Sequence, residues 1–138
     1  MVYINRNLLK KIEIAVSITT LHHVQLAMPK GGEDAARAFY GGLLGLSEAL
    51  KPPILAARGG VWFEKGEVRL HLGVEQDFRP ARKAHPAFQV QGVTVLLAHL
   101  AAKGVSVTHD HTLPGFIRGY VNDPFGNRIE LLEPAPSG

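Results

Sequence analysis

The feature that most constrains this 138-residue chain is a pattern that occurs twice. Each copy begins with a predicted strand, HHVQLAM in the first copy and HPAFQVQ in the second. A segment with helical periodicity follows, and then two strands joined by a tight turn, EKGE in the first copy and DPFGN in the second. Because units of this size can share one core, we expect a single α+β domain built from two modules.

The spacing inside the two copies supports the repeat. Gly45-Leu-Ser parallels Gly104-Val-Ser, and each glycine follows a predicted helix, as is typical of a helix C-terminus. Gly45 precedes His71 by 71 − 45 = 26 positions, and Gly104 precedes Glu130 by 130 − 104 = 26 positions. Two similar hairpins can follow helices by chance. Equal offsets that end on two side chains able to bind a metal ion favour a true repeat.

Changes in this pattern divide the chain into segments. The segments are an N-terminal extension at 1–20, a domain at 21–134 with module one at about 21–74, a linker at 75–84 and module two at about 85–134, and a tail at 135–138. The extension holds Glu13 within its short apolar run and has no small-residue cleavage site, which argues against a signal peptide. It is interpreted either as an added strand or as an upstream reading-frame artefact.

Composition excludes several classes of function. The chain has no cysteine, so thiolate metal sites and disulfides are excluded. Its net charge is +3, and its basic residues are scattered apart from a short cluster at 79–83, so we expect no nucleic-acid partner. No apolar run approaches the about 20 residues that span a bilayer, so we expect no membrane partner. Nothing in the sequence favours secretion, and we expect a cytoplasmic location.

Strand alternation separates the polar side chains by face. In the opening strand His22 shares a face with Val24, whereas His23 shares the other face with Gln25, so the two histidines are not expected to point at one site. In VRLHLGV and NRIELLE, His71 and Glu130 lie on the faces opposite the apolar ones. Each module thus supplies a histidine on its first strand and a possible metal ligand on its last.

The candidate ligands are His23, His71, His85 and Glu130. Imidazole and carboxylate groups suit Zn²⁺, Fe²⁺, Ni²⁺, Mn²⁺ or Co²⁺, and a set of this kind can leave positions open for water or substrate. Such an ion can polarise a carbonyl, stabilise an enediolate or lower the pKa of bound water. Taken singly, each histidine is explained as well by a hydrogen-bonded strand end, and only the matching positions in the two modules favour the site.

Three stretches of the chain resemble the vicinal oxygen chelate superfamily, which includes glyoxalase I, extradiol dioxygenases, and the fosfomycin- and bleomycin-resistance proteins. LHHVQLAMPKGGEDAARAFYGGLLGL resembles its opening strand and helix, AHPAFQVQGV the start of its second module, and GYVNDPFGNRIELLEP its closing hairpin. The last stretch is the most specific. The resemblance covers about Leu21 to Pro134 and implies paired βαβββ modules whose curved mixed sheets surround a cleft.

The resemblance also implies roles for individual residues. The four positions that meet the metal are matched, in order, by His23, His71, His85 and Glu130. His23, rather than His22, matches the first of them. Tyr120 falls where the fosfomycin-resistance branch has a tyrosine beside the metal. Glyoxalase I usually has a glutamate at the second position, so His71 departs from its proton-shuttling arrangement. Gln25 replaces a threonine of the fosfomycin-resistance branch. We expect Glu130 and Tyr120 to be catalytic, and Gln25, Trp62, Phe63, Arg118 and Tyr120 to contact substrate.

Competing functions remain open from the sequence. The first is a metal-dependent lyase or dioxygenase that acts on a small substrate with vicinal oxygens. The second is a bleomycin- or fosfomycin-resistance-like protein, either a binder that sequesters a flat or cationic ligand or a thiol transferase. The third is a structural or regulatory partner with a vestigial cleft. We expect a homodimer in each case, because short strands leave sheet edges and faces that need cover.

Overall fold

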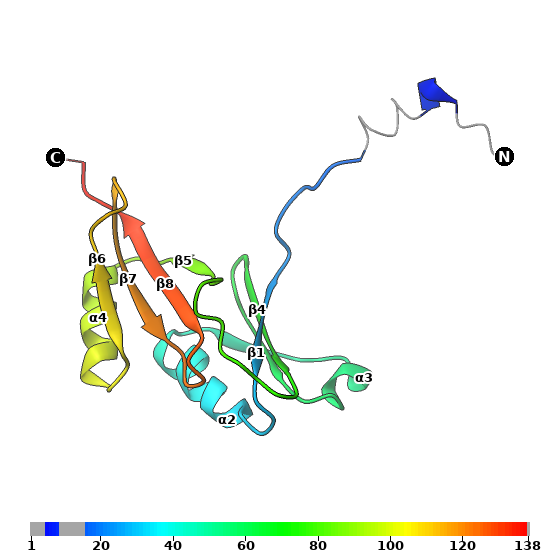
Figure 1. Ribbon diagram of the computed structural model, residues 1–138, viewed down its shortest axis with the longest axis horizontal. Coiled ribbons are helices and arrows are strands. Elements are labelled where there is room, and N and C mark those ends of the chain that lie inside the picture. The colour runs from blue at the N-terminus through cyan, green and yellow to red at the C-terminus, as the bar shows by residue number, and fades with distance from the viewer. Residues whose placement is uncertain (1–4, 9–15, 138) are drawn as a thin grey trace.

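The computed structural model describes residues 5–8 and 16–137 (Figure 1). Within the predicted N-terminal extension, residues 1–4 and 9–15 lie outside the described part, so its interpretation as an added strand is not tested there. Residues 16–22 are exposed, have no regular secondary structure and lead away from the body of the molecule in Figure 1. Residues 6–8 of the extension are helical, and the labelled helices and strands all belong to the two modules.

Module one forms a four-stranded mixed sheet. Its elements are β1 (Val24–Met28), α2 (Glu33–Ala36), the π-helical segment η1 (Arg37–Leu43), β2 (Ser47–Ala49), α3 (Pro53–Ala56), β3 (Val61–Lys65) and β4 (Val68–Val74). The strand order is β1-β4-β3-β2, with β1 parallel to β4 and the other pairs antiparallel. The first and last strands of the module therefore lie side by side.

Module two repeats this arrangement. Its elements are β5 (Ala87–Gln89), α4 (Val93–Ala102), β6 (Val107–Asp110), β7 (Phe116–Asn122) and β8 (Arg128–Pro134). The strand order is β5-β8-β7-β6, again with the first and last strands parallel. The α+β class and the two-module repeat predicted from the sequence are confirmed. Periodicity did not place the short elements β2, β6 and α3, which have three or four residues each.

The helix of module one follows its sequence signals. Glu33 and Asp34 lie in its first turn, where carboxylates complement the helix dipole. The segment then widens into π-helical turns, and adjacent Phe39 and Tyr40 are both buried there. The helix ends at Leu43, and Gly45 follows with φ +77°, a left-handed conformation that glycine adopts without steric cost.

Helices cover only one face of each sheet. In module one the covered face carries apolar residues that pack with η1: Leu26, Met28, Val61, Phe63, Leu70 and Leu72. In module two α4 packs against β7 so closely that a Cβ at Gly119 would lie 2.8 Å from Leu97 Cδ1. Figure 1 shows α4 lying along one side of this sheet. The opposite sheet faces carry the polar and aromatic residues described below.

A buried polar network joins the two modules and the linker. Tyr40 in η1 donates its hydroxyl to Asp123 Oδ2 over 2.7 Å. The side-chain amide of Asn127 donates to Asp123 Oδ2 at 2.9 Å and to the Ala27 carbonyl at 2.8 Å, and its Oδ1 accepts from the Ala81 amide at 2.9 Å. Burial, with the charge of Asp123, raises the pKa of Tyr40 above its ordinary range, so the phenol stays a donor. The modules are therefore fixed to each other by hydrogen bonds as well as by a shared core.

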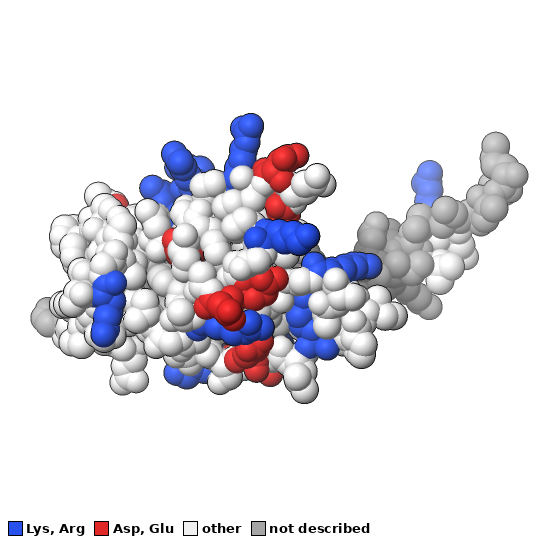
Figure 2. Space-filling view, turned by 90° about the horizontal axis from the view of Figure 1, so that it is seen from below, with Lys and Arg blue, Asp and Glu red and all other residues white. Residues whose placement is uncertain are grey.

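The molecular surface mixes charges of both signs. Figure 2 shows acidic and basic side chains lying among one another on one face. Arg37 pairs with Asp34 at 2.9 Å and with Glu48 at 3.0 Å, and all three side chains are exposed, so these pairs add little to stability. Among the described residues, no helix has the length and apolar character needed to cross a membrane.

Candidate metal centre

In module one, three rings stack on the sheet face away from the helix. His71 in β4 lies in register with Trp62 in β3 and with Gln25 in β1. The imidazole of His71 is parallel to the indole of Trp62, with ring centroids 4.0 Å apart and an interplanar angle of 6°. His23 stacks on the other side, with its centroid 4.3 Å from that of His71. His23 and His71 therefore form one half of the predicted ligand set.

This stack disfavours a positive charge on His71. Burial lowers the pKa of His71, and the charges of His23, His22 and Lys51 lower it further. A neutral imidazole keeps a lone pair, which is the form that binds a metal ion.

In module two, the corresponding face holds the other half of the set. Glu130 in β8 lies in register with Tyr120 in β7 and with Ala87 in β5. His85 Nε2 approaches Glu130 Oε1 to 2.9 Å, and the ring of Tyr120 meets that of His85 edge-on, with centroids 5.5 Å apart. Glu130 is only 6% exposed, because these neighbours cover it on a face that alternation alone would leave open.

The two modules place equivalent residues in equivalent positions. His23 lies two residues before Gln25, which pairs with His71, and His85 lies two residues before Ala87, which pairs with Glu130. From the adjacent strand, Trp62 pairs with His71, and Tyr120 pairs with Glu130. The equal offsets found in the sequence therefore correspond to equal places in the two sheets.

The protonation of His85 shows what its contact with Glu130 requires. His85 Nδ1 lies 2.7 Å from the Lys83 carbonyl, which can only accept, so Nδ1 carries a proton. In the neutral ring Nε2 is then a lone-pair acceptor, and it faces a carboxylate oxygen, which is also an acceptor. The contact at 2.9 Å therefore requires a second proton on His85, a proton on Glu130, or a cation shared by both atoms.

Arg118 and Asp110 hold the other side of Glu130. Arg118 Nη1 lies 3.4 Å from Glu130 Oε2, and Arg118 Nη2 lies 3.1 Å from Asp110 Oδ1. The hydroxyl and the amide of Thr112 donate to Asp110, and with Arg118 they lower the pKa of Asp110 to about 2. Asp110 therefore stays ionised and keeps Arg118 beside Glu130. This leaves Oε1 directed at His85.

The donor atoms of His85 and Glu130 fit a divalent transition metal. Donors bound at about 2.1 Å with angles of 90–110° stand about 3.0–3.4 Å apart, close to the 2.9 Å between His85 Nε2 and Glu130 Oε1. The hydrogen bond from His85 Nδ1 to a backbone carbonyl is the usual outer support of a metal-binding histidine. Within residues 5–8 and 16–137, however, no group of three or more candidate side chains lies close enough to hold an ion. One chain thus provides two separate pairs.

The other predicted site residues divide between the open faces and the core. Trp62, Tyr120 and Arg118 are half-buried beside the two ligand pairs. Gln25 is exposed in β1 and lines, together with His85, a pocket of about 330 Å³ at the junction of the modules. Phe63 was predicted to contact substrate, and this prediction is wrong, because Phe63 is 1% exposed and lies in the core facing η1. Phe63 and Trp62 are adjacent in a strand, so only one of them can face the open side.

The arrangement of His22 also differs from expectation. Strand β1 begins at Val24, so alternation does not govern the two histidines before it. The Nδ1 atoms of His22 and His23 lie 3.0 Å apart. The two rings meet edge-on, whereas alternation would have placed them on opposite faces of the strand. His22 therefore contacts His23 directly, while only His23 stacks on His71.

Of two further features of the centre, one was missed from the sequence. The Lys83 carbonyl, which fixes the tautomer of His85, belongs to the linker and carries no sequence signal. Arg128 lies over the ring of Tyr120, with its guanidinium carbon 4.8 Å from the centroid. Its position two residues before Glu130 in β8 already placed both side chains on one face from the sequence, since strand side chains alternate.

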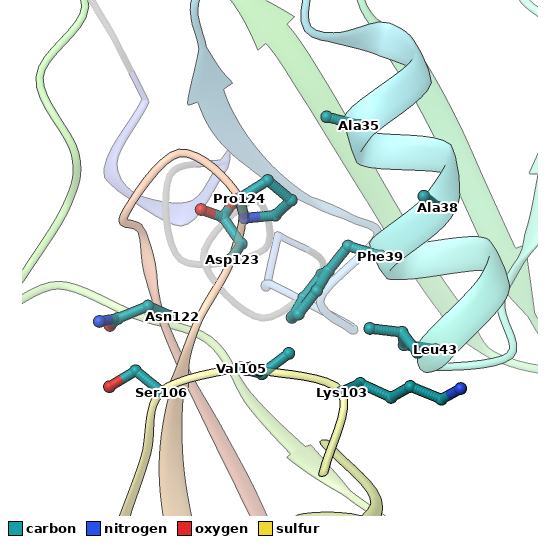
Figure 3. A pocket seen from close by; sticks show the side chains of 11 residues that line it. Ala35, Ala38, Phe39, Leu43, Lys103, Val105, Ser106, Asn122, Asp123 and Pro124 are labelled. Carbon is teal, nitrogen blue, oxygen red and sulfur yellow. The ribbon is translucent and has the colours of Figure 1, made fainter. Parts of the chain in front are cut away.

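A larger groove lies elsewhere and contains none of the predicted ligands. It has a volume of about 620 Å³ and runs between η1 and the loop before β6 (Figure 3). Phe39, Leu43, Val105 and Pro124 supply much of its apolar lining. Asp123 is its one acidic residue, and it is already engaged by Tyr40 and Asn127. The carboxylate of this groove is therefore already committed to the network that joins the modules.

Comparisons with known proteins agree with this architecture. The model of the Glyoxalase/Bleomycin resistance protein/Dioxygenase superfamily matches residues 20–131. A crystal structure of a glyoxalase family protein from Bacillus anthracis is similar with 48% identity and a TM-score of 0.83, covering 87% of this chain and 98% of that one. No curated protein matches significantly.

More distant solved structures share the fold. A lactoylglutathione lyase from Agrobacterium tumefaciens is 26% identical with a TM-score of 0.66, covering 84% of this chain and 94% of that one. A fosfomycin resistance protein from Listeria monocytogenes is 18% identical with a TM-score of 0.70, covering 86% and 96%. Because the family model matches residues 20–131, which are most of the chain, the chain belongs to the glyoxalase/bleomycin resistance protein/dioxygenase superfamily.

Proposed function

We propose that this protein is a metal-dependent enzyme that binds a divalent ion through His23, His71, His85 and Glu130 and acts on a small substrate with vicinal oxygens. The contact between His85 Nε2 and Glu130 Oε1 is the observation that carries the proposal. His85 Nε2 and Glu130 Oε1 face each other at 2.9 Å while the other imidazole nitrogen is engaged by the Lys83 carbonyl, and this arrangement suits a shared cation. Divalent metals are common in this family.

The two ligand pairs require a second copy of the chain in this account. Each pair stands on the sheet face that the helices leave uncovered, and the two pairs belong to different sheets. In a two-fold symmetric dimer, the His23–His71 pair of each copy would meet the His85–Glu130 pair of the other, and two identical sites would form. The covered faces would then lie outside and the aromatic faces inside.

The side chains around the site have separable roles. A bound divalent ion supplies a Lewis acid that stabilises negative charge on a chelated substrate oxygen. Arg118 holds Glu130 Oε2 so that Oε1 is presented to the site. Tyr120 lies against His85 and is the candidate proton donor to the substrate. Trp62, parallel to His71, gives the opposite side a flat apolar surface.

His71 limits which reaction can be carried over from the relatives. The relative from Agrobacterium tumefaciens is named a lactoylglutathione lyase. In glyoxalase I, which this chain resembles, a glutamate usually stands where His71 stands here. A neutral imidazole stacked between two rings is a ligand rather than a strong base, so we propose metal-assisted chemistry without a carboxylate base at this position.

The ring stack also favours one second candidate. Trp62, His71 and His23 form a continuous flat surface that could hold a planar ligand without any metal. That reading corresponds to a binding protein of the bleomycin-resistance type. It predicts a metal-free protein that binds planar aromatic compounds and loses this binding in Trp62→Ala.

Metal analysis of the purified protein tests the proposal directly. We expect about one ion per chain in the parent and at least about a tenfold loss of affinity in His85→Gln and in Glu130→Gln. His99→Gln is the matched control, because His99 is exposed on α4 and should not alter metal content. Equal metal content in all four proteins would exclude this site and leave the planar-ligand binder.

A further inference from the structure

Arg128 is a cation beside the candidate metal centre, and it has no negative partner among residues 5–8 and 16–137. It lies two residues before Glu130 in β8, so both side chains project from the same face of the sheet. Its guanidinium carbon stands 4.8 Å from the centroid of the Tyr120 ring. Contact with an aromatic face favours a cation and fixes its position. Arg128 is half-buried, so part of its hydration has already been lost.

The neighbouring Arg118 shows the contrast. Arg118 also lies over Tyr120, at 5.4 Å, but it is paired with Asp110 and Glu130, and it donates to the hydroxyl oxygen of Thr112. Among the residues that the structure describes, no carboxylate pairs with Arg128 and no side chain accepts a hydrogen bond from it. Arg118 is therefore held by side chains of the protein itself, whereas Arg128 is available to bind a ligand.

The charges of this face favour an anionic ligand. Asp110 and Glu130 balance Arg118 and Arg128, so the four side chains are neutral together. The divalent ion of the proposed site would leave two positive charges in excess. A half-buried site with such an excess attracts an anion, and a guanidinium binds a carboxylate or another oxyanion through two parallel hydrogen bonds.

We infer that the substrate carries a carboxylate or similar oxyanion, which Arg128 binds while the vicinal oxygens lie beside His85 and Glu130. This inference rests on the proposed function and names the substrate class of the same site. Two positions along a strand place the backbones of Arg128 and Glu130 about 7 Å apart, so one small ligand can reach both side chains. A molecule that has only the two oxygens fills half of the site. Arg128 is therefore a residue that determines specificity.

A matched pair of probes tests this inference. Catechol has two vicinal oxygens on a planar ring, and 3,4-dihydroxybenzoate adds a carboxylate on the far side of the same ring. The dissociation constant of each probe is measured calorimetrically with the dialysed metal-free protein and with protein of known metal content. We expect the carboxylate to improve binding about tenfold or more in the parent, and Arg128→Gln to abolish the preference while leaving catechol binding unchanged.

Further variants separate a binding role from a structural one. Arg128→Lys keeps the charge and should restore part of the preference, whereas the exposed Arg58→Gln should behave as the parent. If Arg128→Gln keeps the full preference for 3,4-dihydroxybenzoate both with and without metal, the inference is overturned. Metal analysis of the same samples separates a failure of the proposed function from a failure of this inference. Absence of metal counts against the proposed function. A carboxylate preference that depends on Arg128 still supports the inference in that case.

Discussion

The imidazole of His71 lies flat against the indole of Trp62, with their ring centroids 4.0 Å apart. Trp62 is the single tryptophan of the chain, so its fluorescence reports on one half of the candidate metal centre without any label. A neutral imidazole leaves indole fluorescence largely intact, whereas an imidazolium quenches it. Protonation of His71 is thus directly observable.

The first prediction concerns the pH dependence of this fluorescence in the metal-free protein. Burial and the neighbouring charges lower the pKa of His71, so quenching should appear only as the pH falls below the ordinary histidine value of about 6.5. The unfolded chain then binds the proton more readily than the folded one, so the free energy of unfolding also decreases as the pH falls below about 6.5. His71→Gln should remove the fluorescence transition. A transition of full size in that variant would show that another group causes it.

The second prediction concerns the buried network that joins the modules. Asn127→Ala removes three hydrogen bonds and leaves the Ala27 carbonyl and the Ala81 amide without their partner, so it should lower the free energy of unfolding by about 3 kcal/mol. Tyr40→Phe should cost about 1–2 kcal/mol, because Asp123 loses one donor. Urea denaturation measures both effects.

Asn122→Ala is the matched control for this network. Asn122 is exposed at the end of β7, and its substitution should change stability by less than about 0.5 kcal/mol. A loss in Asn127→Ala no larger than that of the control would mean that the core alone holds the modules together.

The third prediction concerns the support of Glu130. Without the charge of Asp110, Arg118 would bind Glu130 alone and compete with the metal ion for its carboxylate. Asp110→Asn should therefore weaken metal binding about tenfold, as measured by competition with a chelator. Because the pKa of Asp110 is about 2, the parent keeps this support at every pH at which histidines bind metal.

Asp34→Asn controls for the loss of an acidic partner of an arginine. Asp34 pairs with Arg37 at 2.9 Å on the exposed surface, away from the ligand pairs. Its substitution should leave the metal affinity unchanged. Equal affinities in Asp110→Asn and the parent would show that Arg118 does not position Glu130.

The sequence was sufficient for the features that depend on periodicity. The two modules, the hairpins β3–β4 and β7–β8, and the glycine stops at Gly45 and Gly104 follow from hydrophobic patterns and from local backbone preferences. Equal offsets to His71 and Glu130 placed both on last strands, since the two copies fold alike. Short elements such as β2 escaped detection because three residues are fewer than one recognisable alternation.

Features that depend on packing between distant residues were not predictable in this way. Alternation does not extend to residues before a strand begins, so the contact of His22 with His23 was missed. Alternation allows only one of Trp62 and Phe63 on the open face, and the packing of the core shows that the buried one is Phe63. The separation of the ligands into two pairs depends on how whole sheets face each other, which no local pattern encodes.

The central claim is that each metal site takes one ligand pair from each of two chains, and a complementation experiment tests it most directly. His23→Ala and Glu130→Ala chains with different tags are co-expressed, and the mixed dimer is isolated through both tags. Each variant alone should bind little metal, because each of its sites lacks one ligand. The mixed dimer has one site with both losses and one intact site, so it should recover about one ion per dimer, against about two in the parent. A mixed dimer with no more metal than the separate variants, or a parent that is monomeric by light scattering and still binds metal, would contradict the account.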